Sequence, residues 1–203
     1  MKQNNIFPPA HQQMLKRSDK ESLLKQQGVL IWFTGLSGSG KTTLAIALEK
    51  ELFGKGYLTC ILDGDNMRSG INANLGFSEE DRMENIRRIA ETGKLLVECG
   101  IITIVACISP TEKIRAIPRF LFGKDDLVEI FISAPVDVCE TRDVKGLYRK
   151  ARSGEIKEFT GVSAPFEYPE NPDMVLDTSI LEIGECVSAI MNLIKQKEKL
   201  CIK

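Results

Sequence analysis

The sequence predicts an α/β protein in which a five-stranded parallel sheet carries helices on both faces. Five short runs rich in β-branched residues recur along the chain, and the segments between them are long enough for crossover helices; the runs are 29–33, 59–62, 101–107, 127–132 and 174–176. Each run is almost continuously apolar, as buried strands are when helices cover both faces of a parallel sheet.

Length and charge limit the number of domains and the kinds of partner. The 203 residues favour one domain, and 27 basic side chains nearly balance 28 acidic ones, which leaves a net charge of −1. A chain this close to neutral has no overall field that attracts nucleic acid, so local basic clusters must recognise anions. No apolar run reaches the roughly 18 residues that a membrane-spanning helix needs. We therefore expect small-molecule partners, no nucleic acid and no membrane.

The N-terminal part of the chain differs in composition from the rest. Residues 1–27 are predicted to form a polar extension, and residues 28–203 a single domain. The chain starts with Met1-Lys2-Gln3-Asn4-Asn5 and lacks the apolar core of a signal peptide. The six cysteines contain no Cys-x-x-Cys pair and the single histidine is His11, so the sequence offers no thiolate or imidazole metal site. These features predict a cytoplasmic protein with reduced thiols.

A phosphate-binding loop follows the first predicted strand. Residues 35–42 match G-x-x-x-x-G-K-[ST] at every fixed position, which predicts a P-loop NTPase fold. The glycines let backbone amides surround phosphate oxygens, Lys41 neutralises the β- and γ-phosphates, and the Thr42 hydroxyl is placed to bind Mg²⁺. The residues expected to bind ATP are Gly35, Leu36, Ser37, Gly38, Ser39, Gly40, Lys41, Thr42, Thr43, Arg142 and Arg152.

The P-loop alone leaves GTPases, motor ATPases and small-molecule kinases open. The chain has no N-K-x-D motif, with which GTPases recognise the guanine base, and this weakens the GTPase interpretation. Asp63 follows the second strand but Gly64 comes next, where a motor ATPase would carry a glutamate that activates water. A kinase fits these observations better.

Two carboxylates, Asp63 and Asp65, follow the second strand at the carboxyl edge of the sheet, where α/β proteins bind their ligands. One of them could accept the proton of an acceptor hydroxyl or hold the water shell of Mg²⁺. The alternative is a solvated Asp-Gly turn, which the nearby P-loop disfavours. Further along, Ser78 is a predicted N-cap for a helix over about 79–99, and the segment 145–168, with its glycines and basic side chains, is a predicted basic lid.

The combined motifs resemble those of the adenylylsulfate kinases. The resemblance covers about residues 28–177 and lies in the P-loop and in Asp63-Gly64-Asp65-Asn66, Leu75-Gly76-Phe77-Ser78, Asp81-Arg82-x-x-Asn85-Ile86-Arg87-Arg88, Ile108-Ser109-Pro110, Lys145-Gly146-Leu147-Tyr148, Phe159-Thr160-Gly161 and Ala164-Pro165-Phe166-Glu167. It implies transfer of the ATP γ-phosphoryl to the 3′-hydroxyl of adenosine 5′-phosphosulfate (APS), which gives 3′-phosphoadenosine 5′-phosphosulfate (PAPS) and ADP. It also implies a homodimer.

The resemblance assigns the remaining site residues. It implies a catalytic set of Lys41, Asp63, Asp65, Ser109 and Lys145. It implies an APS-binding set of Asp63, Arg68, Phe77, Arg82, Asn85, Ile108, Ser109, Lys145, Leu147 and Phe166. These residue types suit the substrate, because guanidinium groups form paired hydrogen bonds with phosphate or sulfate oxygens and aromatic rings stack on adenine.

Several alternatives remain open from the sequence. Ser109 could form a phosphoserine intermediate, contact APS directly, or cap the helix that follows Pro110. Phe77 and Phe166 could be ordinary core residues. The whole chain could be another P-loop small-molecule kinase, or a nucleotide-binding regulator without catalytic activity.

Overall fold

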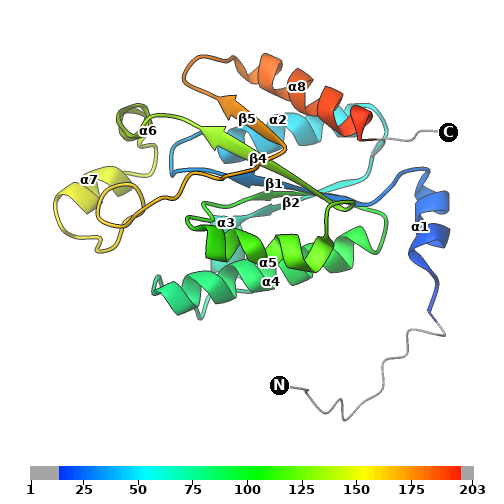
Figure 1. Cartoon of the computed structure of the whole chain (residues 1–203), viewed down its shortest axis with the longest axis horizontal. Helices are drawn as coiled ribbons and strands as arrows, with labels where there is room; N and C mark the ends of the chain where they lie inside the picture. The colour runs from blue at the N-terminus through cyan, green and yellow to red at the C-terminus, as the bar shows by residue number, and fades with distance from the viewer. Residues whose placement is uncertain (1–13, 198–203) are drawn as a thin grey trace, which may run out of the picture.

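The computed structural model describes residues 14–197, so His11 and Cys201 lie outside the described part. Its five strands are parallel and lie in the order β2-β3-β1-β4-β5 (Figure 1). The strands are β1 (Val29–Thr34), β2 (Thr59–Asp63), β3 (Ile102–Ala106), β4 (Leu127–Ser133) and β5 (Met174–Asp177). They confirm the predicted α/β fold.

Helices cover both faces of the sheet (Figure 1). One face is packed by α2 (Lys41–Gly54) and α8 (Ile183–Gln196), and the other by α4 (Glu79–Val97) and α5 (Glu112–Phe122). The fully buried strand β1 explains this arrangement. Val29, Ile31 and Phe33 pack in the hydrophobic cluster with α2 and α8, whereas Leu30 and Trp32 pack in the cluster with α4 and α5. Successive side chains of a strand point to opposite faces, so a run without polar residues must be covered twice.

Four shorter helices complete the described part of the chain, and they are α1 (Arg17–Leu24), α3 (Gly64–Ser69), α6 (Val136–Arg142) and α7 (Leu147–Arg152). Both α6 and α7 lie at the side toward which the strand arrows point, and α1 lies at the opposite side (Figure 1). The carboxyl ends of the strands therefore face α6, α7 and the loops next to them.

Helix α4 forms as its sequence predicts. The hydroxyl of Ser78 accepts a hydrogen bond from the Asp81 amide at 3.1 Å, which satisfies one of the unpaired amides at the start of the helix. Ile86 and Ala90 are buried against the sheet, on the stripe expected from their spacing. The helix ends at Val97, about one half-turn before the expected end.

Ser109 does not cap the helix that follows Pro110. The prediction of a capping role, one of three alternatives for this residue, is therefore wrong. The N-cap of α5 is Thr111, whose hydroxyl accepts from the Ile114 amide at 3.4 Å. Ser109 lies two residues earlier and has a φ of 46°, in the left-handed region. Its backbone turns the chain from β3 toward α5 instead of starting the helix.

Arg17 and Gln26, which precede β1, form hydrogen bonds and an ion pair at the amino edge of the sheet. Arg17 in α1 forms an ion pair with Asp126 at 2.5 Å and donates to the Gly28 carbonyl at 2.7 Å. The Gln26 amide donates to the carbonyls of Leu58 and Gly100, at 3.0 and 2.7 Å. These contacts join chain segments that precede four of the strands. Within residues 14–197, no helix is long and apolar enough to cross a membrane.

Candidate active site

The phosphate-binding loop joins β1 to α2 at the carboxyl edge of the sheet. Gly38 and Gly40 have φ values of 77° and 93°, which favour glycine. A Cβ atom on Gly38 would lie 2.7 Å from the Cys139 carbonyl oxygen, so α6 packs directly against the loop backbone. Gly38 is therefore required by conformation and by packing, and Gly40 by conformation.

Lys41 is buried at the start of α2, with 8% of its surface exposed. Its Nζ donates to the carbonyl of Leu36 at 2.6 Å, which places the amino group inside the loop. Burial lowers the pKa of Lys41 to about 8, because the charged form is poorly solvated there. An anionic group in the loop would supply the charge partner that this amine lacks.

Thr42 and Asp63 form the link between the loop and β2. The Thr42 hydroxyl donates to Asp63 Oδ2 at 2.7 Å. The other carboxylate oxygen, Oδ1, caps α3 by accepting from the amides of Asp65 and Asn66 at 3.0 and 3.3 Å. Asp63 is thus held by three donors, with Oδ2 turned toward the phosphate loop.

This oxygen pair fits Mg²⁺. A hydroxyl and a carboxylate are hard oxygen donors, and Mg²⁺ in phosphotransferases takes one or two protein oxygens plus waters and substrate phosphates. Among residues 14–197, no group of three or more His, Cys, Asp or Glu side chains could form a complete protein cage. Thr42 and Asp63 are the residues that would hold the ion, together with the phosphates of a nucleotide.

Asp65 and Lys145, two more of the residues expected to be catalytic, contact each other. Lys145 Nζ and Asp65 Oδ2 form an ion pair across the site, and both side chains are more than half exposed. The pair joins α3 to the start of the segment 145–168. Exposed ion pairs contribute little stability, so this pair can open at small cost when a substrate enters.

Ser109 lies at the inner wall of the site, where 1% of its surface is exposed. The indole Nε1 of Trp32 donates to its hydroxyl at 3.0 Å, and Arg115 donates to its carbonyl at 2.8 Å. Its neighbour Ile108 is half-buried, and its carbonyl accepts from the Thr34 hydroxyl at 2.7 Å. The loop of Ile108 and Ser109 is therefore fixed to β1 through Trp32 and Thr34.

Arg68 and Arg82 both contact Phe77, which is itself one of the two aromatic residues expected to stack on adenine. The Arg68 guanidinium carbon is 4.5 Å from the centre of the Phe77 ring, which is 65% exposed. Arg82 donates to the Phe77 carbonyl at 2.8 Å, to the Thr160 hydroxyl at 2.8 Å and to the Glu158 carbonyl at 2.6 Å. Burial lowers the pKa of both arginines. Arg82 thus connects α4 with the segment 145–168.

Asn85 lies one turn after Arg82 on α4 and is buried. Its Oδ1 accepts from the Nδ2 of Asn72 at 2.9 Å. Because the oxygen is engaged, the Nδ2 end of Asn85 is the end that would donate to an anion. The amide orientation of Asn85 therefore depends on a residue outside the expected set.

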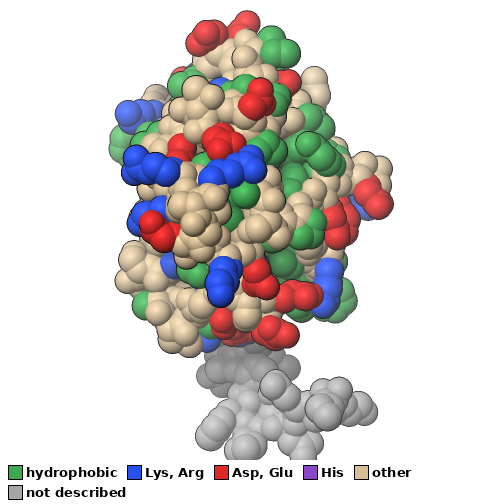
Figure 2. Space-filling view, turned by 90° about the vertical axis from the view of Figure 1, so that its left-hand side faces the viewer, with side chains coloured by type: hydrophobic (Ala, Val, Ile, Leu, Met, Phe, Trp, Pro, Cys, Tyr) green, Lys and Arg blue, Asp and Glu red, His purple; other side chains and the backbone are tan. Residues whose placement is uncertain are grey.

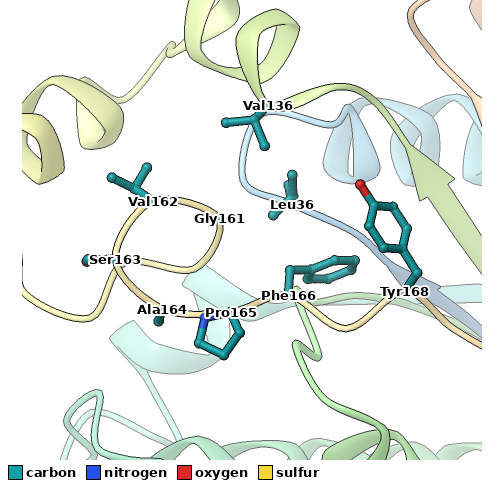
Figure 3. Close-up of a pocket in the computed structure, with 9 residues that line it drawn as sticks. All are labelled: Leu36, Val136, Gly161, Val162, Ser163, Ala164, Pro165, Phe166 and Tyr168. Carbon is teal, nitrogen blue, oxygen red and sulfur yellow. The ribbon is translucent and has the colours of Figure 1, made fainter.

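A pocket of about 390 Å³ lies between the phosphate loop and the segment 145–168 (Figure 3), and its lining residues are Leu36, Val136, Gly161, Val162, Ser163, Ala164, Pro165, Phe166 and Tyr168. The Phe166 ring stacks on Phe131, with centroids 5.9 Å apart and planes at 25°. Leu147 packs in the hydrophobic cluster that contains Leu36. One end of the pocket is therefore aromatic.

The two arginines expected to bind ATP lie in different surroundings. Arg142 donates to the Gly38 carbonyl at 3.4 Å and to the Thr178 carbonyl at 2.6 Å, so it borders the loop. Arg152 forms an ion pair with Glu140 at 3.0 Å. Figure 2 shows this side of the molecule, where Lys and Arg side chains lie among Asp and Glu side chains.

Two residues outside the predicted site set hold the phosphate loop. Thr178 donates to the Ser39 carbonyl at 2.8 Å, and Tyr148 donates to the Ser37 carbonyl at 2.9 Å, so both hold the phosphate loop. Thr178 directly follows β5, and the rule that drew attention to Asp63 after β2 also applies there. Trp32 and Arg115 had no such signal, since one lies in an apolar strand and the other on a helix.

Comparison with known proteins gives a consistent result. Residues 27–177 match the family model described as "Adenylylsulphate kinase". The chain is 61% identical over 194 residues to an adenylyl-sulfate kinase of Bacteroides fragilis, covering 96% of both chains. It is 58% identical over 197 residues to one of Bacteroides thetaiotaomicron, covering 97% of this chain and 98% of the other.

A solved structure is also similar. The APS kinase CysC of Mycobacterium tuberculosis, solved in complex with AMPPNP and APS, is 44% identical to this chain. The match has a TM-score of 0.81 and covers 84% of this chain and 99% of the other. The similarity therefore extends to the three-dimensional arrangement.

Proposed function

Because this chain belongs to the adenylylsulfate kinase family, we propose that it transfers the γ-phosphoryl of ATP to the 3′-hydroxyl of APS and releases PAPS and ADP. The observation that supports the proposal is that the segment 145–168 contacts two groups of residues, with Gly161 against Leu36 of the phosphate loop and Thr160 hydrogen-bonded to Arg82. The phosphate loop with Lys41 forms the donor half of the proposed site, and Arg68, Phe77 and Arg82 form the acceptor half. An ATP-dependent enzyme that uses an anionic nucleotide as acceptor needs both.

The donor half binds the triphosphate. Lys41 would exchange its bond to the Leu36 carbonyl for the β- and γ-phosphate oxygens, and charge on those oxygens increases as the bond to ADP breaks. The bound Mg²⁺, held by Thr42 and Asp63, would neutralise further phosphate charge. Phosphoryl transfer depends mainly on such positioning and charge stabilisation.

The acceptor half binds APS. Arg68, Arg82 and the Nδ2 end of Asn85 would contact the phosphosulfate anhydride, because forked guanidinium donors match its oxygens. Phe77 and Phe166 would stack on the adenine ring. Arg82 would have to leave Glu158 and Thr160 to do so, which couples APS binding to movement of the basic lid 145–168.

Asp63, Asp65 and Lys145 would surround the transferred group. The contact of Asp63 with Thr42 supports a metal-holding role over that of a base for the 3′-hydroxyl. The Asp63→Asn variant separates the two roles. Recovery of activity at raised Mg²⁺ concentration supports metal holding, whereas a loss that Mg²⁺ does not reverse supports base catalysis.

A panel of acceptors tests the proposed function. ADP formation from MgATP is measured with APS, adenosine, gluconate and shikimate. We expect ADP formation with APS and not with the other three acceptors. Turnover with another acceptor in place of APS would support a different P-loop kinase, and ATP binding without any turnover would support a non-catalytic regulator.

We also propose a homodimer in the cytoplasm. The family resemblance supports the dimer, and sedimentation equilibrium would measure it. The compartment is supported by the cysteines, since Cys60, Cys99, Cys107, Cys139 and Cys186 are free thiols, as is typical of a reducing compartment. Cell fractionation would test that assignment.

A further inference from the structure

We propose that Arg115 is a positioning residue that joins the two walls of the APS site, the loop of Ser109 and the segment of Phe166. The inference rests on the proposed function. It concerns a residue of α5 that lies behind the site and touches residues from both walls.

Arg115 is a fully buried cation, with 0% of its surface exposed. Its Nη1 donates to the Ser109 carbonyl at 2.8 Å, and its Nε and Nη2 donate to Glu112 Oε1 at 3.1 and 2.8 Å. The guanidinium carbon is 5.9 Å from the centre of the Phe166 ring. A buried charge is tolerated when it is paired, so these contacts fix the guanidinium in one place.

Hydrogen bonds around Arg115 tie the same two walls together. The Glu112 amide donates to Glu167 Oε2 at 2.6 Å, and the Glu167 amide donates to the Pro110 carbonyl at 2.8 Å. The Glu170 amide donates to Glu112 Oε1 at 3.2 Å, the oxygen that also accepts from Arg115. The segments around Ser109 and Phe166 are therefore held at a fixed separation.

Ser109 needs this support because its backbone is strained. A φ of 46° is uncommon for a residue with a side chain and persists when surrounding contacts determine it. Those contacts come from Arg115 to its carbonyl, Thr34 to the same carbonyl at 3.3 Å and Trp32 to its hydroxyl. Without the Arg115 donor, the loop can relax and the APS site changes shape.

Arg119 offers a matched control one turn further along α5. It forms ion pairs with Glu112 at 2.5 Å and with Glu129 at 2.7 Å, so it belongs to the same charge network. Its hydrogen bonds go to these two carboxylates, whereas those of Arg115 also reach Ser109. A general loss of stability should follow from either substitution, but a change at the APS site only from the substitution of Arg115.

Steady-state kinetics provides the first readout. We expect Arg115→Gln to raise the KM for APS about tenfold or more, as loss of a hydrogen bond from a charged group does, with the KM for MgATP changed less than about twofold. Arg115→Lys keeps the charge but replaces the forked guanidinium with a single donor nitrogen, and we expect a rise of about threefold to tenfold. Arg119→Gln should lower Tm and leave both KM values within about twofold.

Trp32 provides a second readout, because it is the single tryptophan and its indole binds Ser109. We expect APS to change the fluorescence of the wild type and of Arg119→Gln at low concentration. For Arg115→Gln, the change should need a correspondingly higher APS concentration, and the emission maximum before APS is added should also shift. MgADP is the control ligand and should give titrations that agree among the three proteins.

The possible outcomes are distinct. An unchanged KM for APS in folded Arg115→Gln, or equal increases in both KM values, overturns the role of Arg115. If Arg115→Gln does not fold, Arg115→Lys decides, and a KM for APS within twofold of the wild type overturns the proposal. A wild type without APS-dependent turnover refutes the proposed function itself, and this inference with it.

Discussion

Burial lowers the pKa of Lys41 at the phosphate loop. Its amino group donates to a backbone carbonyl and its pKa is lowered to about 8. Near pH 8, about half of the free protein therefore carries a neutral Lys41. Phosphate oxygens beside Nζ favour the charged form and raise that pKa again, so nucleotide binding should take up a proton.

Calorimetry can measure this proton. We expect MgADP binding at pH 8 to take up about half a proton through Lys41, seen as a dependence of the binding enthalpy on the ionisation enthalpy of the buffer. The affinity should fall as the pH rises above 8, because the free protein then has to gain the proton. Lys41→Met is the control, and an equal proton uptake in that variant would contradict the account.

In the proposed function, the charge of Lys41 would also stabilise the phosphoryl group during transfer. We expect Lys41→Ala to lower kcat about 10²-fold or more, as removal of one transition-state charge contact does in other enzymes. Circular dichroism and Tm would show whether the variant is folded. Turnover near that of the wild type in a folded variant would be incompatible with the assigned role.

Ser109 illustrates how a buried hydroxyl limits the possible mechanisms. Its hydroxyl accepts a hydrogen bond from the Trp32 indole, a group that cannot remove its proton. We expect Ser109→Ala to keep kcat within about tenfold of the wild type, because direct transfer needs no covalent step. A loss of about 10⁴-fold, together with a phosphorylated serine in the wild type, would instead support an obligatory phosphoserine.

At the level of elements, the segment 145–168, the proposed lid, is held to the core by a few defined contacts. Tyr148 binds the Ser37 carbonyl, and Arg82 binds Glu158 and Thr160. Gly161 lies against Leu36, where a Cβ atom would come within 2.8 Å of Leu36 Cδ2. This close approach would let the proposed lid cover the phosphate loop and exclude water from the transferred group.

Gly161→Ala tests this close approach. We expect kcat/KM for APS to fall about tenfold or more, because the methyl group separates the lid from Leu36. Gly154→Ala is a matched control, since Gly154 has a similar φ of 80° but no heavy atom within 4 Å of its would-be Cβ. Equal kinetic losses in both variants would show that backbone strain, and not the contact with Leu36, is responsible.

In the molecule as a whole, the carboxyl edge of the sheet carries the candidate site, and the amino edge carries contacts that stabilise the fold. The carboxyl edge carries the phosphate loop and the lid, whereas the contacts of Arg17 and Gln26 lie at the amino edge. A change at the amino edge should therefore affect stability and leave the chemistry unchanged.

Arg17→Ala tests this division. We expect the free energy of unfolding to fall by about 1–3 kcal/mol, because a half-buried carboxylate of Asp126 and the Gly28 carbonyl lose their donor. The kcat and KM of the folded protein should not change. Lys55→Ala is the control, because its exposed pair with Glu51 should contribute less than about 1 kcal/mol.

The sequence predicts the sheet well because each strand is a nearly unbroken apolar run, and the P-loop because its spacing is tied to one backbone shape. It does not predict that Thr111 caps α5 in place of Ser109, since a serine before a proline and a threonine after it are both acceptable caps. Thr178 and Arg115 act through contacts with residues distant in sequence or on other elements, and such contacts depend on how the strands are ordered.

Transfer of the γ-phosphoryl group to APS can be followed with a label on that group. ATP that carries ¹⁸O on its γ-phosphoryl oxygens is mixed with APS and Mg²⁺, the nucleotide products are separated, and the labelled phosphate group is identified by its isotope shift in ³¹P NMR. We expect the label at the 3′-position of PAPS, with about 10²-fold less formed by Lys41→Ala. Label recovered as inorganic phosphate alone, or on an acceptor other than APS, would contradict the account.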